Sequence, residues 1–144
     1  MEGQPQIQFF FESAKAPLFD EGPARHWVAD VIRREGKMPG VLQFIFCDDE
    51  YLMSINKKYL QHDEYTDIIT FDYSEEYPQG VSGDIFISYT RVRDNARLYD
   101  VTDLEETYRV MVHGVLHLLG YDDGDDEARE LMQAKENYYL SLIP

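Results

Sequence analysis

The sequence predicts an α+β fold, also described as an α/β sandwich, with a small mixed sheet of about four strands and five helices packed on it. Three observations predict this fold. Four short stretches are rich in aromatic and β-branched residues, which is typical of strands. Five other stretches repeat apolar residues at helical spacing. The chain has 144 residues and no repeat or linker, so we expect a single domain over residues 1–144.

The first half of the chain alternates strands with helices. Strands are predicted at residues 6–11 and 41–47, and helices at 20–36 and 48–59. Asp48 is a suitable N-terminal cap for the second helix. Because a helix connects the first two strands, the right-handed crossover rule predicts that they are parallel.

The second half contains two strands followed by three helices. The strands, at residues 67–73 and 83–89, are joined by a loop, which favours an antiparallel pair. The helices are predicted at residues 90–99 and 102–119, and in a last segment that ends near residue 142. The sheet is therefore expected to be mixed.

Composition limits the classes of function. The net charge is −15, with 28 acidic residues against 13 basic ones, which argues against non-specific binding to nucleic acid. Cys47 is the single cysteine in the sequence, which fits a reducing compartment. No apolar run approaches the roughly 18 residues that span a bilayer, and residues 1–11 contain no basic segment followed by a long apolar run. We therefore expect a soluble, cytoplasmic protein without a membrane partner.

The end of the longest predicted helix carries the clearest chemical signal. His113 and His117 are four residues apart, so they lie on one face of a helix, and Gly120 is placed to end that helix. Asp122 and Asp123 follow directly. Two imidazoles and one carboxylate can bind a metal ion and leave a position open for water or substrate. The alternative is that the two histidines are ordinary core or surface residues.

Further motifs lie on both sides of this helix, and together they resemble the YbeY family. The histidine signature of that family is His-Gly-x-Leu-His-Leu-x-Gly-Tyr-Asp-His, and the chain matches it from His113 to Asp122. The resemblance extends from about residue 45 to the end of the chain. The other matching residues are Asn56, Tyr59, Asp63, residues 66–71, residues 83–85, Glu127, Met132 and Glu136.

The resemblance implies a bacterial metal-dependent endoribonuclease that cuts single-stranded RNA. Such an enzyme acts in maturation of the 3′ end of 16S ribosomal RNA and in ribosome quality control. Its expected partners are ribosomal RNA and the ribosome or a ribosomal protein. The resemblance also implies that His113, His117 and Asp123 are the metal-binding and catalytic residues. We expect one divalent ion per chain, zinc in the first place, with iron, nickel or manganese as alternatives.

Two departures from the family pattern affect the site. Asp123 stands where the family has a third histidine, which changes the ligand set to two histidines and one carboxylate. Leu60 stands where the family usually has an arginine that handles RNA. Arg109, Lys57 and Lys58 are the candidates to replace it in substrate binding, although Arg109 can equally be an ordinary helix surface residue.

The sequence leaves the general base and two other functions open. Zinc proteases carry a glutamate directly after the first histidine, which acts as the general base. Gly114 stands at that position here, so a zinc protease would lack this base. Asp67 and Asp122 are equal candidates for the base. The chain could also be another hydrolase or iron(II) enzyme with the same ligands, or a ribosome-assembly factor without catalysis.

Overall fold

The computed structural model describes residues 6–12, 19–60 and 66–144. These residues form a four-stranded mixed sheet and five α-helices, which confirms the predicted fold class. In chain order, the elements are β1 (Gln6–Phe11), α1 (Glu21–Arg34), β2 (Pro39–Cys47), α2 (Asp49–Ile55), the π-helix η1 (Asn56–Leu60), β3 (Ile68–Asp72), β4 (Val81–Ser88), α3 (Tyr89–Leu98), α4 (Asp103–Leu118) and α5 (Asp126–Leu140).

The strand order in the sheet is β1-β2-β4-β3. The pair β1 and β2 is parallel and the pair β3 and β4 is antiparallel, as the connections between them predicted. The strand β4 also pairs with β2, in parallel, so β4 lies inside the sheet between a parallel and an antiparallel neighbour. The sequence did not predict this order.

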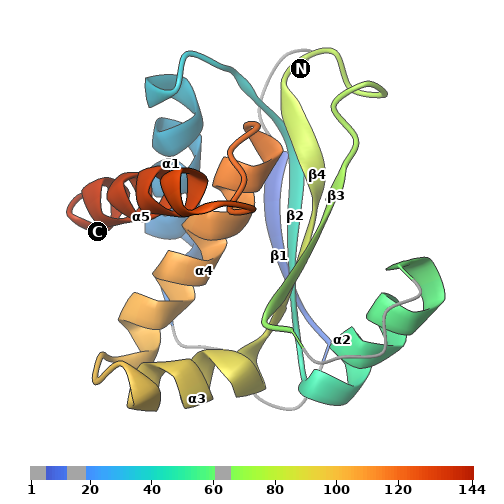
Figure 1. Ribbon diagram of the computed structural model, residues 1–144. Coiled ribbons are helices and arrows are strands. Elements are labelled where there is room, and N and C mark those ends of the chain that lie inside the picture. Colours follow the sequence, from blue (N-terminus) through green and yellow to red (C-terminus); the bar gives the residue numbers. More distant parts are fainter. Residues whose placement is uncertain (1–5, 13–18, 61–65) are drawn as a thin grey trace.

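The helices α1, α4 and α5 gather on one face of the sheet (Figure 1). The main core lies between them and the sheet and includes Phe44, Ile85, Ile87, Met111 and Leu116, each 0% exposed. A second, smaller cluster packs α2 onto the sheet through Cys47, Leu52 and Ile69. The sheet is therefore covered along one face by three helices, among them the one that carries both histidines of the predicted metal site.

Side-chain caps mark the start of α2, α3, α4 and α5. Asp48 accepts a hydrogen bond of 2.8 Å from the Tyr51 backbone at the start of α2, as predicted for an N-terminal cap. Thr102 accepts one of 3.0 Å from the Glu105 backbone and so fixes the first turn of α4. The helix predicted at residues 48–59 is observed as α2 followed directly by the π-helical turn η1.

Candidate metal centre

The helix α4 holds the two histidines close to the sheet. It buries an almost continuous apolar stripe. Gly114 lies between the two histidines along the helix and faces the strands. A Cβ atom at residue 114 would lie 2.8 Å from Cδ1 of Ile68 and 2.9 Å from Cγ2 of Ile85. Any larger residue there would force the side chains of Ile68 and Ile85, or α4 itself, to shift. Gly114 thus permits the close approach of the histidine helix to the sheet.

The chain turns sharply after α4 and brings a carboxylate back over the helix. Gly120 has a φ angle of +104°, a conformation that side chains disfavour, and it ends the helix as the sequence predicted. Tyr121 then donates a hydrogen bond of 2.5 Å to Glu35, just beyond the end of α1. Asp123 follows two residues later, so this contact ties the loop that carries Asp123 to the body of the protein.

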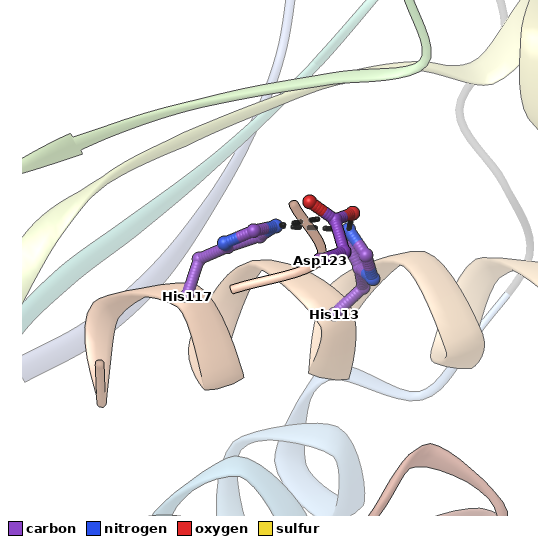
Figure 2. A group of neighbouring side chains, drawn as sticks. All are labelled: His113, His117 and Asp123. Atoms are coloured by element: carbon purple, nitrogen blue, oxygen red, sulfur yellow. Dashed lines mark hydrogen bonds and ion pairs between the residues drawn. The ribbon is translucent and has the colours of Figure 1, made fainter. Parts of the chain in front are cut away.

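Three potential ligand atoms converge in this region (Figure 2). The Nε2 atoms of His113 and His117 lie 3.0 Å apart. Oδ2 of Asp123 lies 3.7 Å from Nε2 of His113 and 3.9 Å from Nε2 of His117. The histidine rings are half-buried, whereas the side chain of Asp123 is 47% exposed, so the site is open on one side.

These separations fit a metal ion. Ligand atoms at about 2.0–2.2 Å from a tetrahedral ion lie about 3.3–3.6 Å from one another, and the three observed distances bracket that range. Two unprotonated imidazole nitrogens 3.0 Å apart repel each other unless a proton or a cation lies between them. The donor set of two nitrogens and one carboxylate oxygen suits zinc, iron(II) and manganese.

The two histidines have different protonation behaviour. Burial alone would lower the pKa of His113, but the hydrogen bond and charge of Glu136, with the charges of Asp67 and Asp123, raise it overall. Burial and the neighbouring ring of His113 lower the pKa of His117. His117 is therefore the ring that stays neutral to lower pH and keeps a nitrogen lone pair for a cation.

A cavity of about 520 Å³ adjoins two of the three candidate ligands, His113 and Asp123. Side chains from α3, α4, α5 and the segment before β3 form its wall. The lining residues are Asp67, Asn95, Tyr99, Val101, Glu106, Arg109, Val110, His113, Asp123, Arg129, Met132, Gln133 and Glu136. The cavity therefore combines carboxylates, amides and two arginines beside the candidate metal ligands.

The structure places the other predicted residues in different surroundings. Arg109 lines the cavity, where its guanidinium contacts the carboxylates of Glu106 and Glu136. Lys57 and Lys58 lie on η1 and do not line the cavity, and the ammonium of Lys58 lies 5.2 Å from the centre of the Tyr59 ring. That these three residues bind substrate stays a prediction, as does metal binding by the three converging ligands.

The fold places the two candidates for the general base in different surroundings. Asp67 lines the cavity beside His113, and burial raises its pKa above the ordinary value. Asp122 is exposed and does not line the cavity; its carboxylate accepts a hydrogen bond of 3.4 Å from the Gly124 backbone. Asp63, which contributed to the family resemblance, lies outside the described residues.

Sequence reasoning missed several residues of the site. Glu136 contacts His113 from α5, and Arg129 lines the cavity from the first turns of the same helix. Glu106 is 3% exposed and has one carboxylate oxygen without a hydrogen-bond partner among the described residues. Glu136 matched the family pattern, but nothing in its local sequence indicated a contact with a histidine 23 positions earlier.

The fold and the site together define a small α+β protein with a two-histidine, one-aspartate candidate metal centre. Comparison with known families identifies the group: residues 11–143 match the family described as Endoribonuclease YbeY. The chain belongs to the YbeY family, as the histidine signature predicted.

Relatives with the same family name cover most of the chain. The protein named Endoribonuclease YbeY from Parabacteroides distasonis is 41% identical over 96% of both chains. Its counterpart from Cytophaga hutchinsonii is 46% identical over 94% of both. The one from Flavobacterium psychrophilum is 50% identical over 82% of this chain and 83% of its own.

A solved structure has the same fold. The solution structure of a Thermotoga maritima protein superposes with a TM-score of 0.64 and covers 94% of this chain and 87% of its own. Its sequence identity to this chain is 24%, so the likeness concerns the fold. In the described part of the chain, none of the helices is both long and apolar enough to cross a membrane.

Proposed function

We propose that this chain is a metal-dependent endoribonuclease that cleaves single-stranded RNA. The observation that carries the proposal is the convergence of ligand atoms from His113, His117 and Asp123, within 4.8 Å of one another, beside a cavity. Membership of the YbeY family supports the reaction class, because the relatives are named endoribonucleases. The bound metal in this proposal is zinc, and iron, nickel and manganese are the alternatives.

The residues divide the chemistry between them. His113, His117 and Asp123 would hold the ion, which when bound lowers the pKa of water toward about 7 and draws charge from the phosphate. Asp67 is the better candidate for the base, because it lines the same cavity and burial raises its pKa. A carboxylate there can take up the proton that the attacking water loses.

Arg129 is a candidate contact for the RNA phosphate. It lines the cavity with His113 and Asp123, its side chain is 55% exposed, and it pairs with the exposed carboxylate of Asp126. One guanidinium nitrogen donates a hydrogen bond of 3.4 Å to the backbone oxygen of Asp123, so the group lies beside the candidate metal centre. Arg109, Lys57 and Lys58 stay further proposed contacts, but Arg109 is engaged with two carboxylates and both lysines lie away from the cavity.

The strong negative charge indicates that RNA affinity comes partly from a partner. A chain with a net charge of −15 repels phosphate over most of its surface. We propose that the substrate is ribosomal RNA at the 3′ end of 16S, reached on the ribosome or through a ribosomal protein. In this proposal the enzyme works in the cytoplasm and contributes to ribosome maturation and quality control.

The test is cleavage of a circular single-stranded RNA, which only an endonuclease can open. Zinc-loaded wild-type protein should cut it, the chelator-treated protein should not, and added zinc should restore cleavage. His117→Ala should abolish cleavage, whereas His26→Ala, at an exposed position of α1, should leave it intact. A folded, zinc-loaded protein that leaves both this RNA and ribosomal RNA uncut would refute the nuclease and favour the assembly factor.

A further inference from the structure

A carboxylate from a different helix contacts the first candidate ligand. Nδ1 of His113, on α4, donates a hydrogen bond of 2.7 Å to Oε2 of Glu136, on α5. The side chain of Glu136 is only 8% exposed, so water competes little for this contact. An ionised carboxylate can only accept, so the hydrogen lies on Nδ1.

This hydrogen bond sets the form of the ring. In a neutral imidazole with hydrogen on Nδ1, the lone pair lies on Nε2. Nε2 is the atom that faces His117, at 3.0 Å, and Asp123, at 3.7 Å. Glu136 therefore selects the tautomer that can bind a cation at the point where the three ligands meet.

Arg109 holds Glu136 in place from the other side. Nη1 of Arg109 donates a hydrogen bond of 3.3 Å to Oε1 of Glu136, the oxygen that His113 does not use. Nε of Arg109 lies 3.7 Å from Oε1 of Glu106. The result is a continuous row of contacts from Glu106 through Arg109 and Glu136 to His113. Both oxygens of Glu136 are thus occupied by donors, which fixes the orientation of its carboxylate.

The two histidines differ in what supports them. The Tyr121 backbone acts on the ring of His117 and opposes the lowering of its pKa by burial, and no side-chain substitution removes that backbone group. His113 depends on a single side chain of another helix. The geometry points to Glu136 as a positioning residue of the metal centre: it holds His113 as the tautomer that binds the ion, and Arg109 holds Glu136. This inference rests on the metal centre of the proposed function and assigns Arg109 to support of the site.

The substitution Glu136→Gln gives a sharp test, because the two side chains have almost the same shape. Arg109 carries only donors, so the amide oxygen of Gln must turn toward it. The amide nitrogen then faces Nδ1 of His113 and donates to it, which moves the ring hydrogen to Nε2. The expected result is an inverted tautomer, visible in nitrogen–proton NMR spectra of the metal-free protein at a pH where both rings are neutral.

Zinc affinity provides the second readout, measured by competition with a chelating dye. We expect Glu136→Gln to weaken binding about 10- to 100-fold, the usual effect of losing such a supporting carboxylate. Glu130→Gln makes the same charge change at an exposed position of α5 and should bind zinc as the wild type does. In the double variant Arg109→Met with Glu136→Gln, no guanidinium holds the amide oxygen of the introduced Gln, so the amide can turn this oxygen toward Nδ1 of His113. The double variant should therefore recover the original tautomer of His113 and part of the zinc affinity.

Wild-type zinc affinity together with an unchanged tautomer in Glu136→Gln would overturn the inference. If Glu136→Gln does not fold, Glu136→Asp replaces it as the test. The shorter side chain keeps the negative charge but moves it away from His113, so the zinc affinity should still fall. An unchanged zinc affinity of Glu136→Asp counts against the inference. If the wild type binds no metal, the proposed function fails, while the tautomer of the metal-free protein still decides the role of Glu136.

Discussion

Tyr121 donates a hydrogen bond of 2.5 Å to Glu35, and this contact joins the loop that carries Asp123 to the end of α1. Tyr139 also donates a hydrogen bond to Glu35, and Lys135 donates one of 3.1 Å. Three donors from the loop and from α5 thus meet one carboxylate whose side chain is 9% exposed. Glu35 therefore stabilises the position of the third candidate ligand without touching it.

Glu35→Gln should destabilise the protein near neutral pH by about 1.5–3 kcal/mol, the range for hydrogen bonds to a charged group. Burial alone would raise the pKa of Glu35, but the donors from Tyr121, Tyr139 and Lys135 lower it below 4.5. The folded state thus favours the charged form, so the stabilisation is present above pH 4.5 and is lost as the pH falls through the lowered pKa. Urea unfolding from pH 7 to pH 3 measures the difference between the wild type and the variant.

The control for this measurement is Glu21→Gln, which removes an exposed carboxylate from the other end of α1. It should change stability by less than about 0.5 kcal/mol. A difference between wild type and Glu35→Gln that stays constant from pH 7 to pH 3 would contradict the assigned role of Glu35.

Glu106→Gln should show the opposite dependence on pH in the metal-free protein. Burial raises the pKa of Glu106 to about 7, although Arg109 opposes the shift. The folded state therefore binds a proton more tightly than the unfolded chain, and wild-type stability should fall as the pH rises from about 4.5 to about 7. Glutamine cannot ionise, so the variant should lack this decline and be the more stable protein at pH 8. Parallel stability curves for the two proteins would argue against a buried, protonatable Glu106.

Gly114→Val should destabilise the fold by about 1–3 kcal/mol, because the added side chain meets Ile68 and Ile85 at less than a normal contact distance. Thermal unfolding of the metal-free protein measures the loss. Gly22→Val is the matched control, since a Cβ atom at residue 22 has nothing within 4 Å. Equal stability of the two variants would mean that α4 does not need its close approach to the sheet.

Arg129→Gln should raise the KM for single-stranded RNA about tenfold, as expected from loss of one charge-assisted hydrogen bond of about 1.5 kcal/mol. The zinc affinity should stay unchanged, because Arg129 is not a ligand in the proposal. Arg33→Gln removes the same charge from an exposed position of α1 and should leave the KM unaltered. The same assay on Lys57→Gln and Lys58→Gln tests whether these two lysines bind substrate. If the KM rises more in these variants than in Arg129→Gln, the RNA binds along η1 instead of at Arg129.

The sequence could predict the parts of the fold that depend on local pattern. The apolar spacing of α4, the cap at Asp48 and the glycine stop at Gly120 are all local, and the structure confirms each of them. The antiparallel pairing of β3 with β4 follows from a connection by a loop without a helix. The placement of β4 between β2 and β3 depends on packing between distant segments, so no local pattern indicated it.

The candidate site divides in the same way. Helical spacing places His113 and His117 on one face, and the turn after α4 brings Asp123 back toward them. Glu136 and Arg129 come from α5, and only the packing of α5 across α4 places them beside the ligands. Acidic residues on an amphipathic helix usually lie on the solvent-exposed face. The local sequence of α5 therefore did not indicate that Glu136 is buried.

The most direct test of the account is the metal content of the protein, by elemental analysis after purification without chelators and again after reconstitution with zinc. We expect about one ion per chain in the wild type and in His26→Ala, and almost none in His117→Ala with an unchanged circular dichroism spectrum. A wild-type protein that binds no metal after reconstitution, or a His117→Ala variant that keeps its full metal content, would contradict the metal centre on which the proposed nuclease depends.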